Sequence, residues 1–93
     1  MTSVARTFYT VETYWWYYPG HHQDPYWLIA ESGPGGNTIE DAHKRVKEDI
    51  KRFVKNKTDL SKIKIRIKKT VTIESVEEEL IGSDFTALML KTA

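Results

Sequence analysis

The alternation of apolar and polar positions along the chain predicts a hairpin of two strands near its start. Residues 4–18 and 26–32 are rich in β-branched and aromatic side chains, which favour strands. The turn-forming pairs Pro19-Gly20 and Asp24-Pro25 separate these two segments. We therefore expect an antiparallel hairpin whose loop has about six or seven residues.

A helix and a third strand are predicted to follow the hairpin. Residues 39–54 carry apolar side chains at helical spacing, directly after the good N-cap residue Thr38. The apolar stripe of this helix consists of Ile39, Ala42, Val46, Ile50, Phe53 and Val54. Residues 62–75 alternate with a period of two instead, as strands do. One face of this strand carries Ile63, Ile65 and Ile67, and the other carries Lys62, Lys64, Arg66 and Lys68.

The remaining segments complete the predicted fold. Residues 32–37 contain three glycines and are expected to end the second strand. Lys69 occupies the apolar register of the third strand, which indicates a bulge or the end of its cover. After a turn at residues 82–84, the apolar spacing over 85–89 favours a short helix over an added strand. We therefore predict one α+β domain over residues 1–93, a two-layer ββαβ fold in which the hairpin and the third strand pack on one amphipathic helix.

The composition excludes several classes of protein. A chain of 93 residues without cysteine has no disulfide, no thiolate metal site and no thiol chemistry. The apolar runs at 14–18 and 26–30 are far shorter than a membrane span. The first residues lack the basic and then apolar order of a secretory signal. We expect a soluble, cytoplasmic protein without a membrane partner and without a cofactor.

The net charge of +1 conceals two segments of opposite charge. Residues 44–69 hold twelve basic and three acidic side chains, and the rest of the chain holds two basic and ten acidic ones, so that the two parts carry +9 and −8. Such a basic segment favours an anionic partner, which is a nucleotide, a nucleic acid or an acidic protein surface. Two alternatives stay open: the basic residues form a solvated surface, or the lysines protect an exposed strand edge.

The aromatic side chains are also concentrated, since nine of the eleven lie between Phe8 and Trp27. One helix covers only one face of a sheet, so the rings on the other face need a different cover. The even-numbered positions Tyr14, Trp16 and Tyr18 are expected on this open face. The C-terminal segment, a second copy of the chain or a ligand could cover them. Aromatic rings beside the basic row would suit the stacking of bases and the binding of phosphates.

The loop of the hairpin carries the only candidate for chemistry. A metal site there is not predicted, because His21 and His22 would need further ligands and only His43 and carboxylates remain. The run Gly20-His21-His22-Gln23 resembles the histidine segment of HicA-type toxins, which cleave RNA. This resemblance covers four residues and implies a catalytic role for one of the two histidines. No catalytic residue is otherwise predicted.

The order of hairpin, amphipathic helix and closing strand resembles the small accessory proteins of bacteriophages. That resemblance implies a binding function, such as the inhibition of a host defence or the sequestration of a nucleotide. The leading prediction is a non-enzymatic module that binds an anionic partner. Its predicted ligand-binding residues are Tyr14, Trp16, Tyr18, His21, His22, Lys62, Lys64, Arg66 and Lys68. The alternatives are a homo-oligomeric protein-interaction module that blocks a host protein and a histidine-dependent RNA-cleaving enzyme.

Overall fold

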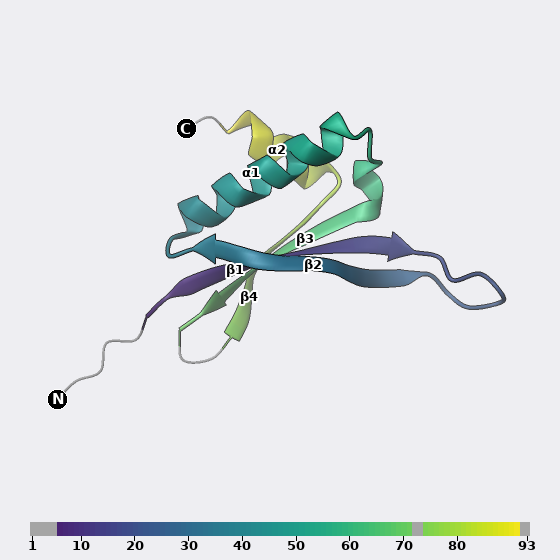
Figure 1. Cartoon of the computed structure of the whole chain (residues 1–93), viewed down its shortest axis with the longest axis horizontal. Coiled ribbons are helices and arrows are strands. Elements are labelled where there is room, and N and C mark those ends of the chain that lie inside the picture. Colours follow the sequence, from purple (N-terminus) through teal and green to yellow (C-terminus); the bar gives the residue numbers. More distant parts are fainter. Residues whose placement is uncertain (1–5, 72–73, 92–93) are drawn as a thin grey trace.

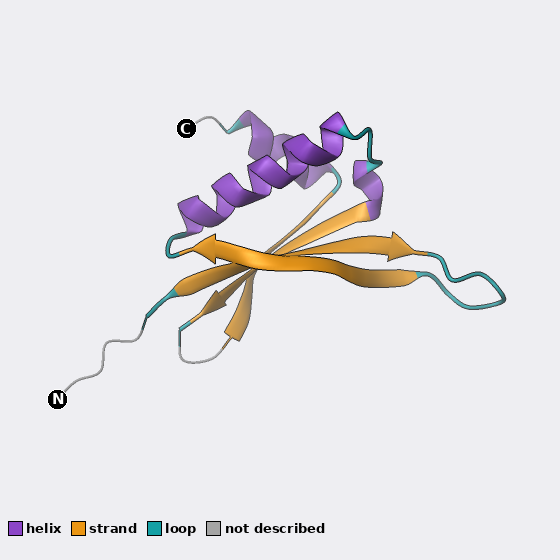
Figure 2. Ribbon diagram, viewed as in Figure 1, coloured by secondary structure: helices purple, strands orange, loops and turns teal. Residues whose placement is uncertain are grey.

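The computed structural model describes residues 6–71 and 74–91, and four antiparallel strands form its sheet in the order β2-β1-β3-β4. The strands are β1 (Phe8–Tyr17), β2 (Tyr26–Gly36), β3 (Ile63–Thr70) and β4 (Glu74–Ile81). Helix α1 (Ile39–Lys55) follows β2, the short 3₁₀ turn η1 (Leu60–Lys62) precedes β3, and helix α2 (Ser83–Leu90) follows β4. Both helices lie over the same face of the sheet (Figures 1 and 2). The predicted two-layer α+β class is confirmed.

The boundaries of α1 follow from its end groups. The Thr38 hydroxyl accepts a hydrogen bond from the Asp41 backbone N–H at 3.1 Å, which caps the first turn. At the other end, the N–H of Thr58 donates to the carbonyl of Phe53 and that of Lys57 to Val54. This pair of bonds is a Schellman motif. Lys57 occupies its left-handed position with a φ of 58°, where glycine is the usual residue.

The core lies between the helices and one face of the sheet. Ile63, Ile65 and Ile67 of β3 are fully buried, as their alternation predicts. Helix α1 adds its apolar stripe, and Phe85 and Leu88 bring α2 onto the same core. The members of the core are Tyr9, Val11, Ala42, Val46, Ile50, Phe53, Ile63, Ile65, Ile67, Phe85 and Leu88. The predicted C-terminal helix is thus present and docked, whereas the predicted stripe residue Val54 is exposed.

An ion-pair network attaches α1 to the edge strand β2. The buried Asp49 carboxylate lies 3.3 Å from Nε of Arg45 and 3.4 Å from a guanidinium nitrogen of Arg52. Arg52 also reaches Glu31 of β2 at 2.7 Å. Burial raises the pKa of Asp49, although both arginines act in the opposite direction. The network therefore fixes the last turns of α1 over the middle of β2.

Several predicted strand limits are wrong. The first strand, predicted over 4–18, begins at Phe8 within the described residues and ends at Tyr17. The second strand does not end at residue 32 but continues to Gly36. In this extension Gly33 pairs with Val11 and Gly36 pairs with Tyr9 of β1. The glycines let the strand approach its neighbours closely, since a Cβ on Gly36 would lie 2.6 Å from Cβ of Asp41. Pro34 is tolerated because β2 is an edge strand.

The predicted third strand over 62–75 is in fact parts of two strands. It begins after Lys62, which belongs to η1, and it ends at Thr70. Glu74 already starts β4, an unpredicted fourth strand that pairs antiparallel with β3. The register of this pair shifts between Ile67 and Lys68, which places the predicted irregularity one residue earlier than Lys69.

Candidate functional site

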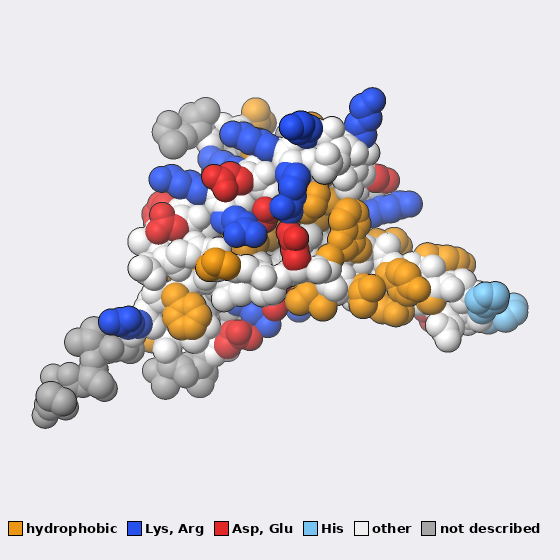
Figure 3. Space-filling model, in the orientation of Figure 1, with side chains coloured by type: hydrophobic (Ala, Val, Ile, Leu, Met, Phe, Trp, Pro, Cys, Tyr) orange, Lys and Arg blue, Asp and Glu red, His pale blue; other side chains and the backbone are white. Residues whose placement is uncertain are grey.

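The outer half of the β1–β2 hairpin extends past the end of α1 and exposes large apolar side chains (Figure 1). We call residues 14–18 and 26–29 the aromatic arm. Its exposed apolar residues range from Trp15, at 37% exposure, to Tyr18, at 71%. They are Trp15, Trp16, Tyr17, Tyr18, Tyr26, Leu28 and Ile29. Figure 3 shows apolar side chains gathered along this arm and the histidines at its tip. The arm contains no charged residue.

The side of the arm that continues the helix-covered face carries two cross-strand pairs. Trp15 is opposite Leu28, and Tyr17 is opposite Tyr26 with ring centroids 5.4 Å apart. Helix α1 reaches only the first pair, where the Phe53 ring meets Trp15 edge-on at 5.9 Å. The cover by α1 therefore stops before the outer pair.

The other side of the arm continues the open face of the sheet. Trp16 is opposite Trp27, with ring centroids 5.1 Å apart and the rings at 62° to each other. Tyr14 is opposite Ile29. The prediction that Tyr14 and Trp16 lie on the open face agrees with the burial of Val11 and Thr13 on the other side, whereas Tyr18 lies beyond the end of β1. The arm thus carries apolar side chains on both of its faces.

Lys64 of β3 closes the inner end of this open-face aromatic cluster. Its ammonium nitrogen lies 4.9 Å from the ring centroid of Trp27 and 5.1 Å from that of Tyr14, in cation–π geometry. Only 6% of the residue is exposed. The loss of hydration lowers the pKa of Lys64; the negative charge of Glu79 acts in the opposite direction, and the positive charge of Arg66 lowers the pKa further. Among the described residues, no carboxylate forms an ion pair with it.

Two other cations of the predicted basic row form ion pairs with glutamates of the neighbouring strands. Arg66 lies 2.5 Å from a carboxylate oxygen of Glu79 on β4. Lys68 lies 2.9 Å from Glu74 on β4 and 3.4 Å from Glu12 on β1. The acidic and basic segments of the sequence therefore meet on the open face, because β4 pairs with β3. The fourth predicted cation, Lys62, is exposed in η1 and does not belong to this row.

The remaining predicted residues lie at the tip of the arm. His21 and His22 are exposed in the hairpin loop and both have positive φ angles, 52° and 67°. Neither imidazole forms a side-chain hydrogen bond within the parts of the chain that the structure describes. No group of three metal-ligating side chains occurs among residues 6–71 and 74–91. The structure therefore groups Tyr14 and Trp16 with Lys64 and Arg66, and it places the histidines apart from them.

Sequence reasoning missed the residues that surround this cluster. Trp27 and Ile29 belong to it because of the hairpin register, and Glu79 belongs to its border because of β4. The hairpin register could have indicated Trp27 as the partner of Trp16. The position of Glu79 depended on a strand that the pattern did not predict.

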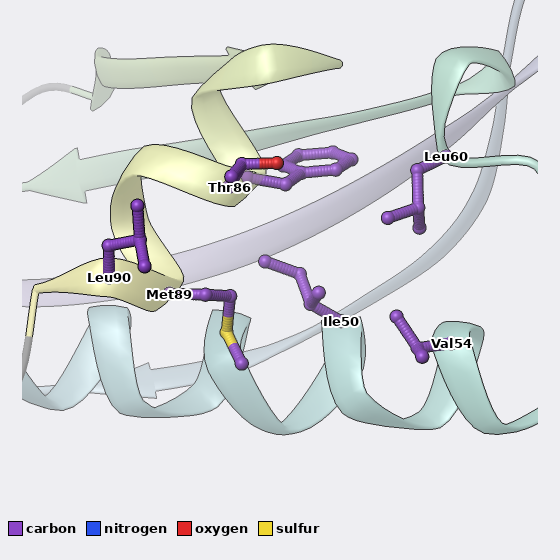
Figure 4. A pocket seen from close by; sticks show the side chains of 7 residues that line it. Ile50, Val54, Leu60, Thr86, Met89 and Leu90 are labelled. Carbon is purple, nitrogen blue, oxygen red and sulfur yellow. The ribbon is translucent and has the colours of Figure 1, made fainter.

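A separate apolar groove of about 200 Å³ lies between α1, α2 and η1. Figure 4 shows Ile50 and Val54 of α1 facing Leu60 on one side and the α2 residues on the other. Its lining consists of Ile50, Val54, Leu60, Phe85, Thr86, Met89 and Leu90. Because Thr86 is its only polar member, the groove offers packing rather than chemistry.

Neither the helices among the described residues nor comparisons with known proteins point to a known class of protein. In the part of the chain that the structure covers, no helix is both long and apolar enough to cross a membrane. No protein-family model, curated protein or solved structure matches the chain.

Proposed function

We propose that this chain is a non-enzymatic binding module whose aromatic arm docks onto another protein. One observation carries the proposal, which is the exposure of large apolar side chains on both faces of a hairpin that extends past its helix. Contiguous exposed apolar surface marks interaction sites on soluble proteins. Tryptophan and tyrosine are also the residues that contribute most to binding at protein interfaces.

The electrostatics of the sheet favour a protein over a nucleic acid as the partner of this surface. A phosphate backbone needs several free cations in a row. On the open face, Arg66 and Lys68 already have carboxylate partners, and Lys64, the strand cation without one, is only 6% exposed. The arm itself is uncharged and would be buried in a protein interface without the desolvation of any charge.

The resemblance to phage accessory proteins gives this proposal one specific form. In that form, the arm occupies a surface of a host protein and blocks it. The proposal that the arm is a docking surface does not depend on this resemblance.

Photo-crosslinking in the cells that produce the protein tests the proposal. A benzophenone amino acid would replace Tyr17 on the arm in one variant and the exposed Lys44 of α1 in a control variant. We expect discrete protein adducts from position 17 and none from position 44. The proposal is wrong if position 17 gives no adduct, or if both positions give the same adducts.

A small anionic ligand is a second candidate, which the position of Lys64 favours. Its ammonium group lacks a carboxylate partner among the described residues and lies beside the rings of Tyr14 and Trp27, an arrangement that suits a phosphate with a stacked base. The test is the fluorescence anisotropy of a labelled single-stranded oligothymidylate. We expect Lys64→Met to abolish binding and Lys62→Met, which removes an equal charge from η1, to retain it. The absence of binding to the wild-type protein, or an equal loss in both variants, would exclude this candidate.

A further inference from the structure

The two edges of the sheet differ in how they are protected against pairing with another strand. The β4 edge carries the charged residues Glu74, Glu77, Glu78 and Glu79, and charged side chains on an edge strand oppose its pairing with another strand. Three of the four form ion pairs within the same copy, and Glu77 has no such partner among the described residues. The outer half of the β2 edge, residues 26–30, is a tyrosine followed by four apolar residues and has no charge and no proline. An exposed, uncharged and apolar edge is the kind of strand that pairs with another chain.

We propose that the partner of the aromatic arm is a second copy of this chain, joined through antiparallel pairing of β2 with β2 across a two-fold axis at Leu28. This inference rests on the proposed function, because it assigns an occupant to the same arm. The two four-stranded sheets would become one continuous sheet of eight strands. The acidic β4 edges would lie at its two ends and stop further growth, so the assembly closes as a dimer.

The register follows from symmetry and from the length of the uncharged run. A two-fold axis perpendicular to the sheet keeps each side chain on its own face, so a residue must be opposite itself at the centre. With Leu28 at the centre, Tyr26 is opposite Ala30 and Trp27 is opposite Ile29. This register pairs the whole run 26–30 with itself. Any other centre places part of the run opposite residues outside it.

This register also supplies cover for the outer pair of the arm. Glu31 lies beside the last turn of α1 in each copy, because Arg52 in that turn binds it. In the Leu28-centred register, Glu31 of one copy comes beside Tyr26 of the other, because Ala30 is the extra residue of a bulge in β2 and places Glu31 on the same face as Leu28. The last turn of the second α1 therefore comes alongside the Tyr17–Tyr26 pair, which the copy's own α1 does not reach. The helices of both copies lie on the same face of the joined sheet.

Leu28→Lys tests the proposal, and Val76→Lys is its matched control. The two residues have similar exposure, 44% and 49%, and lie on opposite edges of the sheet. By sedimentation, we expect twice the chain mass of 10.8 kDa for the wild type and for Val76→Lys, and the monomer mass for Leu28→Lys. Circular dichroism would check that each variant is folded. A monomeric wild type, or a Leu28→Lys dimer, would overturn the proposal.

Disulfide trapping tests the register in a variant that is expected to remain a dimer. The chain has no cysteine, so Leu28→Cys introduces a single thiol. Across the proposed axis the two Cβ atoms would be about 4.5–5.5 Å apart, near the distance that a disulfide needs. We expect a covalent dimer from Leu28→Cys under mild oxidation and none from Val76→Cys. Equal trapping in both variants would contradict the register.

The failure of this inference can be distinguished from the failure of the proposed function. If position 17 crosslinks to a different protein while the wild type sediments as a monomer, the arm is a docking surface but its partner is not a second copy. If position 17 gives no adduct, the proposed function itself fails.

Discussion

The Thr13 hydroxyl provides a sharp test of how β1 packs beneath α1. Thr13 lies in the middle of β1, on the face that the helices cover, and only 1% of it is exposed. Its hydroxyl oxygen is buried and has no hydrogen-bond partner among the described residues. Valine has nearly the same shape as threonine and favours strands as strongly. The substitution Thr13→Val therefore removes an unpaired polar group and leaves the packing in place.

The expected gain in stability follows from two contributions. A buried hydroxyl without a partner costs about 1–3 kcal/mol in mutational data. The added methyl group contributes up to about 0.8 kcal/mol through its own burial. Because burial calculated from a folded structure is an upper estimate, we expect Thr13→Val to raise the free energy of unfolding by about 1–2 kcal/mol. In a domain of this size that corresponds to a Tm increase of about 4–8 °C for each kcal/mol.

Urea denaturation followed by circular dichroism measures this change, at one fixed protein concentration since association shifts apparent stability. Thr10→Val is the matched control, because Thr10 lies on the same strand but on the opposite, partly exposed face. The control should change the stability by less than about 0.5 kcal/mol. A Thr13→Val variant that is no more stable than the wild type would show that the hydroxyl is hydrogen-bonded, and would refute this account of the helix-covered face of β1.

Three further predictions concern the ends and the charges of the helices. Phe85→Ala should destabilise the fold by about 3–5 kcal/mol in urea denaturation, because Phe85 is buried. Leu90→Ala in the same helix should cost less than about 0.5 kcal/mol, because Leu90 is 76% exposed. Equal effects of the two substitutions would mean that α2 is not docked. Lys57→Gly should raise the free energy of unfolding by about 0.5–1 kcal/mol, because glycine adopts the left-handed backbone conformation of this position without the steric cost that lysine has. An unchanged urea midpoint would argue against the Schellman geometry. The pKa of Asp49 is raised by burial, so the folded state binds its proton more readily than the unfolded state does. The wild type should therefore gain stability relative to Asp49→Asn as the pH falls from 7 towards the ordinary aspartate value of 3.8, and a difference that is constant or shrinks would contradict the sign of the shift.

The sequence pattern predicted the elements whose side chains have a regular period. The apolar stripe that starts at Ile39 predicted α1 to within one residue of its end, and the alternation of Ile63, Ile65 and Ile67 identified the buried face of β3. Strand β4 was not predicted because its four glutamates do not favour strands and a register shift interrupts its alternation. The extension of β2 was missed because glycines that permit close packing are indistinguishable in sequence from glycines that end a strand.

The candidate site could be predicted only in part, for a related reason. The positions of Tyr14 and Trp16 on the open face follow from parity along one strand, which the sequence contains. The ion pair between Arg66 and Glu79 depends on which strands are neighbours, and one chain's pattern does not specify that order. A charge count along the sequence therefore suggested a free basic surface where the fold brings acids and bases together.

The central position of β1 in the sheet has a consequence for synthesis of the chain on the ribosome. Strand β1 pairs with β2 on one side and with β3 on the other, and β3 begins 27 residues after the last residue of β2. At a synthesis rate of about 5–20 residues per second, β3 emerges on the order of seconds after the hairpin is complete. During this interval the nascent chain presents its aromatic residues without β3 and, until residue 55 has emerged, without the complete helix α1. We therefore expect the emerging hairpin to be a substrate for ribosome-associated chaperones.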